Sequence, residues 1–172
     1  SEIIRTQIEY TRMYNELGSV RPGWYFLGDI IREQIPAFES SGIVIETVPE
    51  ELWLYADPMI GKVFYNLIDN AVRYGEKITR IRFSWVERGD TLVIICEDDG
   101  AGIADEMKQK IFLRGVGKNT GFGLFLAREI LSITGMTIEE TGTEGSGARF
   151  EITLPPGGFR IMGSVHDRSF RQ

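Results

Sequence analysis

The chain has 172 residues, of which 42% are hydrophobic and 26% charged, and its formal net charge is −6. This length suffices for one well-buried domain and is short for two. The acidic balance argues against a surface for nucleic acid or anionic membranes, and no apolar stretch approaches the ~20 residues that span a bilayer. We therefore expect a single cytoplasmic domain that contacts neither nucleic acid nor membrane.

The first predicted element is a helix over residues 2–17, which ends at Gly18. Ile3, Tyr10 and Leu17 recur at heptad spacing, so this helix has an apolar seam but no core of its own. We expect it to pack on a partner helix outside the main domain. The pattern is equally compatible with a helix that folds back onto its own chain.

The next segments alternate between helix and strand. A helix closed by Gly42 is predicted over residues 24–40, and Asp57 and Pro58 are typical of the start of another that runs to residue 74. Gly123 lies near the start of a further helix over residues 122–134. Strands are predicted from short β-branched and aromatic runs at residues 43–48, 52–55, 79–87, 91–97, 137–140 and 148–154.

This order of elements predicts an α+β fold. The two strands on either side of Arg88 to Asp90 should form a hairpin, and Pro155 to Gly158 should end the regular structure. We expect a two-layer α/β sandwich with a mixed, largely antiparallel sheet and helices on one face. The glycine-rich segment 98–121 is too long for an ordinary connection, and such segments are usually functional.

Two asparagines lie one helical turn apart on the helix over residues 57–74. At about 100° per residue, Asn66, Asn70 and Arg73 cluster beside an apolar stripe, with Asp69 farther toward solvent and Tyr74 nearer the core. An amide oxygen there can complete the coordination of Mg²⁺, and a guanidinium can bind phosphate. Taken alone, two such amides more often only satisfy backbone or solvent.

Two glycine-rich segments follow. Asp98 ends a strand and precedes Gly100 and Gly102, so the backbone can turn sharply and the carboxylate can accept a hydrogen bond from an exocyclic amine. A solvated turn is the alternative. The second segment has glycines at positions 115, 117, 121 and 123, ends at a helix N-terminus that favours phosphate, and carries Lys118.

Together these motifs resemble the ATP-binding catalytic domain of sensor histidine kinases, with the Bergerat fold of the GHKL superfamily that includes gyrase, Hsp90-type and MutL-type ATPases. Asn66 to Tyr74 is similar to the N box, Asp98 to Ile103 to the first glycine box, and Gly121 to Leu124 to the second. The resemblance covers roughly residues 24–156. The start of the chain is similar in style to kinases of methanogenic archaea.

The resemblance implies a role for each matching residue. Asn70 would bind Mg²⁺, Asn66, Arg73 and Lys118 would act at the phosphates of ATP, and Asp98 would bind the adenine amine. Residues 104–120 would form a flexible ATP lid. The remaining nucleotide contacts implied are Tyr74, Gly100, Gly102, Ile103, Gly121, Phe122, Gly123 and Leu124.

The resemblance also implies partners. Residues 1–18 would be the end of a dimerisation helix, residues 19–158 the ATP-binding domain and residues 159–172 a tail. The domain would transfer the γ-phosphate of ATP to a histidine on that separate dimerisation domain, from which a response regulator would take it. Two departures are Ala148, where the family often has Thr or Ser, and the lack of an acceptor context around His166.

Two other functions are compatible with the same motifs. The hydrolysing relatives carry a carboxylate base one turn before the metal-binding asparagine, and Asn66 at that place cannot take a proton. An ATP-driven conformational switch is therefore less favoured than phosphotransfer. A nucleotide-binding or interaction module without catalysis is the third possibility.

Overall fold

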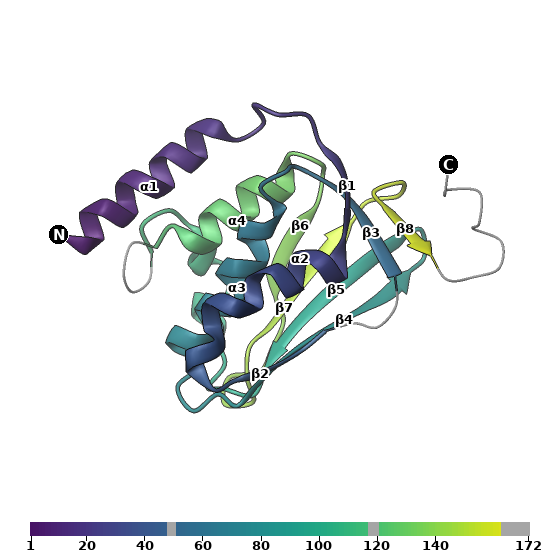
Figure 1. Ribbon diagram of the computed structural model, residues 1–172. Coiled ribbons are helices and arrows are strands. Elements are labelled where there is room, and N and C mark those ends of the chain that lie inside the picture. Colours follow the sequence, from purple (N-terminus) through teal and green to yellow (C-terminus); the bar gives the residue numbers. More distant parts are fainter. Residues whose placement is uncertain (48–50, 117–120, 163–172) are drawn as a thin grey trace.

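The structure is a computed structural model that describes residues 1–47, 51–116 and 121–162. Helices and sheets occupy separate layers, as Figure 1 shows. The helices are α1 (Glu2–Glu16), α2 (Leu27–Gln34), α3 (Ile60–Tyr74) and α4 (Gly123–Ser132), with 3₁₀ turns η1 (Ile35–Ser41), η2 (Asp105–Met107) and η3 (Lys110–Phe112). The strands are β1 (Gly23–Phe26), β2 (Val44–Glu46), β3 (Glu51–Ala56), β4 (Arg80–Arg88), β5 (Thr91–Asp98), β6 (Thr137–Glu140), β7 (Arg149–Leu154) and β8 (Phe159–Met162).

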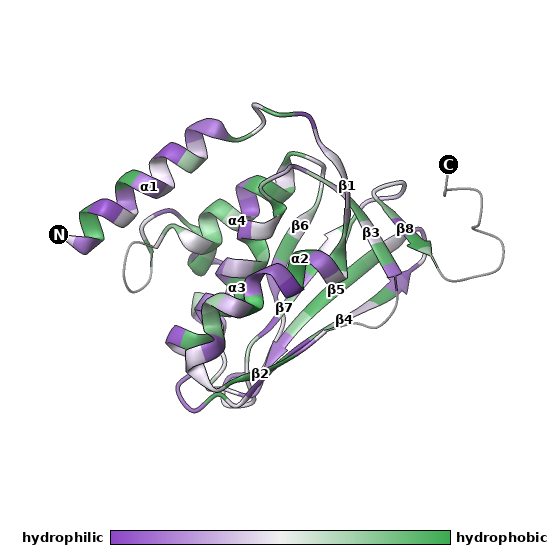
Figure 2. Cartoon of the chain, viewed as in Figure 1, coloured by the Kyte–Doolittle hydropathy of each residue, from purple (hydrophilic) through white to green (hydrophobic). Residues whose placement is uncertain are grey.

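The larger sheet has five strands in the order β2-β4-β5-β7-β6. Only β2 and β4 run parallel, so the sheet is mixed and largely antiparallel as predicted. The helices α2, α3 and α4 lie on one face, and β5, in the middle of the sheet beneath them, is coloured largely as hydrophobic in Figure 2. Phe83, Cys96 and Phe150 are in register across three strands and are buried in this interface. The α+β sandwich is confirmed.

Helix α3 carries the apolar stripe that its spacing predicts. All six stripe residues are buried in the core: Ile60, Val63, Phe64, Leu67, Ile68 and Ala71. Burying each large side chain of this kind stabilises the fold by about 1.5–3 kcal/mol. The helix begins at Ile60, three residues later than expected, because Asp57 Oδ1 accepts a hydrogen bond from the Met59 N–H at 2.8 Å and caps a preceding turn.

The structure also contains a three-stranded antiparallel sheet, β1-β3-β8, that the sequence did not predict. Residues 24–26 were expected to begin a helix and instead form β1. Cross-strand aromatic packing outweighs helical propensity here: Trp24 lies 5.4 Å from Tyr55 and Phe26 lies 5.6 Å from Trp53, between ring centroids. The helix therefore starts only at Leu27.

The predicted end of regular structure at Pro155 to Gly158 is also wrong. Phe159–Met162 forms β8, which pairs with β3 and brings Phe159 and Ile161 against the core. A four-residue strand gives too short a pattern to be recognised beside two prolines. The segment 159–172, expected to be a tail, thus begins with a strand that pairs with the fold. His166 lies outside the described residues.

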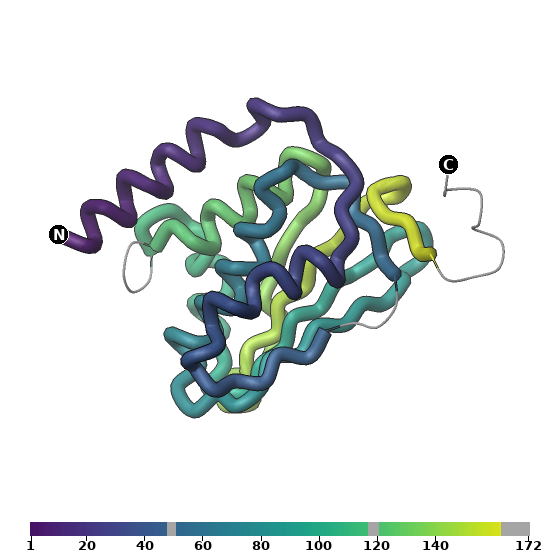
Figure 3. The backbone as a smooth tube through the Cα atoms, in the orientation of Figure 1, coloured from purple at the N-terminus to yellow at the C-terminus, as the bar shows by residue number. Residues whose placement is uncertain are grey.

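Helix α1 folds back against its own chain, which is the second of the two arrangements compatible with its pattern. Tyr10 stacks on Phe122 with ring centroids 6.0 Å apart and planes 9° apart, and Tyr14 packs on Phe125 at 5.8 Å. The tube in Figure 3 shows α1 running beside α4 before an extended segment leads to β1. The helix thus covers one end of α4.

Candidate functional site

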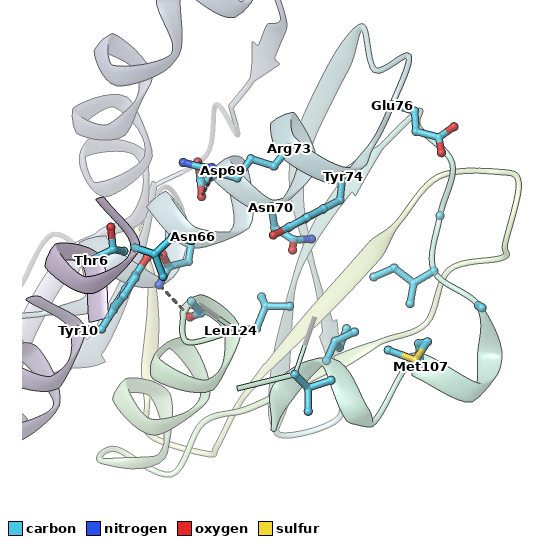
Figure 4. Close-up of a pocket in the computed structure, with 18 of the residues that line it drawn as sticks. Thr6, Tyr10, Asn66, Asp69, Asn70, Arg73, Tyr74, Glu76, Met107 and Leu124 are labelled. Atoms are coloured by element: carbon cyan, nitrogen blue, oxygen red, sulfur yellow. Dashed lines mark hydrogen bonds and ion pairs between the residues drawn. The ribbon is translucent and has the colours of Figure 1, made fainter. Parts of the chain in front are cut away.

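A cavity of about 540 Å³ lies between α3, the start of α4, the segment 102–116 and α1. Figure 4 shows its walls, with side chains from α1 and α3 on one side and Met107 opposite. Its volume is within the 300–1,000 Å³ typical of small-molecule sites. Of the residues predicted to bind a ligand, it brings together Asn66, Asn70, Arg73, Tyr74, Gly102, Ile103, Gly121, Gly123 and Leu124.

Helix α3 presents four polar side chains to the cavity, at spacings of three and four. Asn66, Asn70 and Arg73 lie there as expected, but Asp69 lines the cavity too instead of facing solvent. Arg73 Nε donates to both carboxylate oxygens of Asp69, at 2.9 and 3.0 Å. This hydrogen bond raises the pKa of Arg73, so its guanidinium is a fixed positive charge held by a neighbouring carboxylate.

Asn66 is more deeply buried than its helical position suggested, with only 4% of its surface exposed. Its Nδ2 donates to the Gly123 carbonyl at 2.9 Å, drawn as the dashed line in Figure 4, and its Oδ1 accepts from the Tyr10 hydroxyl at 3.4 Å. Burial raises the pKa of Tyr10 to about 12, so the hydroxyl stays protonated at neutral pH and remains a donor. Asn66 therefore joins α3 to the start of α4 and to α1.

Asn70 lies one turn further along α3 and is half-buried at the centre of the cavity wall (Figure 4). Its amide group is neutral and its oxygen is a hard donor. Such an oxygen suits Mg²⁺, which takes one or two protein ligands and completes its shell with water and phosphate. Asn70 thus fits the predicted metal role, and the aromatic ring of Tyr74 lies directly beside it.

Asp98 is held rigidly at the end of β5. Its Oδ1 accepts hydrogen bonds from the Gly100 N–H at 2.9 Å and the Ala148 N–H at 3.1 Å. Burial raises the pKa of this carboxyl despite the two hydrogen bonds. Asp98, Gly100 and Phe122 do not line the cavity itself, so the structure does not bring these three predicted residues into direct contact with it.

Two glycines allow the backbone to close tightly around Asp98. A Cβ atom at Gly100 would overlap the Gly75 carbonyl, and one at Gly147, where φ is +97°, would overlap the Asp98 carbonyl. The Gly145 N–H donates to the Ala101 carbonyl at 2.7 Å. The segment 141–148 therefore packs directly on the turn that follows β5.

The start of α4 forms the wall opposite Asn66. Gly121, Gly123 and Leu124 line the cavity, whereas the Phe122 ring is buried under Tyr10 and Arg114, whose guanidinium carbon lies 4.8 Å from the ring centroid. The free N–H groups at a helix N-terminus favour an anion. Lys118, predicted to add positive charge here, lies outside the described residues.

Sequence reasoning missed the contribution of α1. Glu2, Ile3, Thr6 and Tyr10 line the cavity, and none of them was a candidate. The heptad seam through Ile3 and Tyr10 was a signal that this face is covered, but it does not identify what covers it. Met107 and Val116, in the segment 104–116, also line this cavity.

Comparisons with known proteins point to one family. The model of the histidine kinase-, DNA gyrase B- and HSP90-like ATPase family matches residues 57–158, which is more than half of the chain. Histidine kinase P4 of Formosa agariphila is 33% identical over 132 residues, which are 70% of this chain and 9% of the relative. The sensor protein SrrB of Staphylococcus aureus is 33% identical over 115 residues, which are 62% of this chain and 20% of the relative.

A solved structure gives the same answer for the fold. The catalytic domain of the histidine kinase ThkA, in a nucleotide-free form, superposes with a TM-score of 0.67 at 28% identity, over 80% of this chain and 99% of that one. The chain thus spans a small part of the two sensor proteins but nearly the whole of an isolated catalytic domain. The chain belongs to the family of histidine kinase-, DNA gyrase B- and HSP90-like ATPases, as an ATP-binding catalytic domain.

Proposed function

We propose that this domain binds Mg-ATP and, within a longer sensor kinase, presents the γ-phosphate to a histidine on a separate helical domain. The observation that carries the proposal is the cavity in which Asn70 and Arg73 of α3 face the N-terminus of α4. Phosphoryl transfer needs alignment and charge neutralisation more than covalent help from the protein. An amide oxygen, a guanidinium and a helix N-terminus supply both.

In this proposal the phosphates lie between α3 and the start of α4. Asn70 holds Mg²⁺, which neutralises phosphate charge when bound, and Arg73 and Lys118 add positive charge. Gly121, Gly123 and Leu124 surround the phosphates with backbone N–H groups. Asn66 lies near them and keeps α4 in place through its hydrogen bond to the Gly123 carbonyl.

The adenine side follows from Asp98. The base extends from Tyr74 past Gly102 and Ile103 toward Oδ2 of Asp98, which accepts a hydrogen bond from the adenine amine. This requires the nucleotide to reach beyond the cavity, because Asp98 and Gly100 are not among the residues that line it. Phe122 contributes indirectly, because its buried ring supports the start of α4.

Phosphotransfer is favoured over ATP hydrolysis because of Asn66. A hydrolysing relative needs a carboxylate base at this place, and here the amide nitrogen donates to the Gly123 carbonyl at 2.9 Å. An amide cannot take the proton of an attacking water. A histidine acceptor brings its own nucleophile, so transfer needs no such base.

The partners proposed are those of a sensor kinase. Residues 1–18 end the dimerisation helix that carries the acceptor histidine upstream, residues 19–158 bind ATP or ADP, and a response regulator receives the phosphoryl group. The domain works in the cytoplasm, whether or not the parent protein is anchored elsewhere. In the described part of the chain, no helix is long and apolar enough to cross a membrane.

Calorimetric titration with ADP tests the nucleotide and metal roles. Asn70→Ala should weaken binding by at least about tenfold when Mg²⁺ is present and should bind like the unmodified domain when EDTA removes the metal. Asn15→Ala, which removes an exposed amide from α1, is the matched control and should change neither value. No binding by the unmodified domain would contradict the proposal.

A second experiment tests the transfer step. The domain is mixed with radiolabelled ATP and the parent's upstream helical segment, and acid-labile, base-stable label on that segment indicates phosphohistidine. Label that appears there only with the unmodified domain, and not with Asn70→Ala, supports a kinase. Nucleotide binding without any transfer would instead indicate a module without catalysis.

A further inference from the structure

A buried ion pair joins the end of β6 to the residue that follows η2. Glu140, at the end of β6, has a side chain with 0% exposed surface, and it pairs with Lys108, whose side chain is 17% exposed. The Glu140 carboxylate also accepts hydrogen bonds from the Gly142 N–H at 2.9 Å and the Arg149 N–H at 3.0 Å. Lys108 Nζ additionally donates to the Gly142 carbonyl at 2.8 Å.

Stability alone is a weak reason for such a pair. Removing two charges from water costs about as much free energy as their attraction returns, and apolar residues of similar size often serve equally well. The pair instead fixes the orientation of both side chains, because four polar contacts hold them in one arrangement. The pair joins Lys108, which follows η2, to Glu140, which lies 32 residues later at the start of the β6–β7 connection.

Each residue of the pair is linked to the proposed nucleotide site through a neighbouring segment. Lys108 follows Met107, which lines the cavity, at the end of η2. On the other side, the segment 141–148 packs on the glycine turn after β5: the Gly145 N–H donates to the Ala101 carbonyl, and the Ala148 N–H donates to Asp98. Moving Glu140 would move the backbone that holds Asp98.

We propose that Lys108 and Glu140 are a positioning pair that fixes the wall around the nucleotide base and so sets the preference for adenine. The inference rests on the proposed function, since it assumes that a nucleotide binds with its base at Asp98. The adenine amine donates to the Asp98 carboxylate, whereas guanine presents a carbonyl oxygen there and is repelled. A loosened wall lets the base shift, which weakens ADP binding more than GDP binding.

The test is calorimetric titration of the domain with Mg-ADP and with Mg-GDP. Lys108→Met should weaken Mg-ADP binding by about tenfold, within the usual range of coupling between linked sites, and should lower the ADP-to-GDP affinity ratio. Lys108→Arg keeps the charge and should restore most of that ratio. Arg88→Met is the matched control, because Arg88 pairs at 2.9 Å with Glu151, another buried carboxylate in the same five-stranded sheet. This variant should leave the ADP-to-GDP affinity ratio unchanged.

The double variant Lys108→Met with Glu140→Gln keeps the test valid if the single variant does not fold, since it leaves no uncompensated buried charge. It should show the same loss of preference for ADP. If Lys108→Met or the double variant folds and keeps the ADP-to-GDP affinity ratio of the unmodified domain, the positioning role is refuted. If the unmodified domain binds no Mg-ADP, the proposed function itself fails, which is a different result.

Discussion

Asp98→Asn separates the structural role of Asp98 from the adenine-binding role that we propose for it. The carboxylate Oδ1 accepts from the Gly100 and Ala148 N–H groups, and the amide oxygen of asparagine can accept the same two hydrogen bonds. The second carboxylate oxygen, however, becomes an NH₂ group. That group would face the adenine amine with a donor instead of an acceptor.

The two roles have different magnitudes. Asp98→Ala leaves two backbone N–H groups without their acceptor and should lower the free energy of unfolding by about 2–4 kcal/mol, whereas Asp98→Asn should change it by less than about 1 kcal/mol. For binding, a lost hydrogen bond to a charged group corresponds to about 1.5–3 kcal/mol. We therefore expect Asp98→Asn to weaken Mg-ADP binding by about 10- to 150-fold.

The pH dependence gives an independent check. Burial raises the pKa of the Asp98 carboxyl in the free domain, and the proposed contact with the adenine amine requires the charged form of this carboxyl. ADP affinity is therefore complete above this raised pKa and falls as the pH drops through it. Asp98→Asn removes this component while the titration of the ADP phosphates stays the same in both proteins.

The assays are urea denaturation for stability and calorimetric titration for binding, each performed across the pH range. A folded Asp98→Asn domain that binds Mg-ADP as tightly as the unmodified domain would refute the adenine role. An Asp98→Asn domain as unstable as Asp98→Ala would refute the division between the two carboxylate oxygens.

Three further predictions concern the supports of the site. Asn66→Ala leaves the Gly123 carbonyl without its donor and should cost about 1–3 kcal/mol in urea denaturation; an unchanged midpoint would contradict this. Gly147→Ala should lower the melting temperature clearly more than Gly145→Ala, because both have positive φ but only the first Cβ overlaps backbone; equal effects would argue against the close approach. Hydrogen bonds from Thr79 lower the pKa of Asp99 to about 2 from its ordinary 3.8, so the stability it contributes should be present above pH 3.8 and lost toward pH 2; melting curves of Asp99→Asn should lack that loss.

The sequence predicted the central helix and sheet because their patterns are long. Helix α3 repeats its apolar residues over four turns, and every one of those residues is buried. The hairpin of β4 and β5 is likewise long and has a glycine with φ of +63° at its turn. In these elements the local sequence pattern agrees with the tertiary packing, so the pattern was sufficient to predict them.

The wrong secondary-structure predictions concern segments whose conformation depends on tertiary contacts. Residues 23–26 form a strand because Trp24 and Phe26 find aromatic partners on β3, and β8 is a strand only because β3 offers it an edge. Asp69 turned from solvent to the cavity because Arg73, one turn away, holds it there. The two strand pairings are not visible in a window of a few residues, whereas the i,i+4 spacing of Asp69 and Arg73 is visible there and was not used.

The structure gathers the predicted residues of α3 and three of the predicted glycines, Gly102, Gly121 and Gly123, around one cavity, but the side of this cavity formed by α1 was not predicted. A heptad seam shows that one face of α1 is covered without showing that α4 covers it, so the contact of Tyr10 with Asn66 could not be foreseen. Asp98 was placed correctly at the end of β5. That Asp98 does not line the cavity could not be read from sequence spacing.

A crystal structure of the domain with Mg²⁺ and a non-hydrolysable ATP analogue would show both proposed contacts at once. We expect the adenine amine within about 3 Å of an Asp98 carboxylate oxygen and Mg²⁺ bound by the Asn70 side-chain oxygen at about 2.1 Å. A nucleotide whose base lies away from Asp98, or a metal ion held without Asn70, would contradict this expectation.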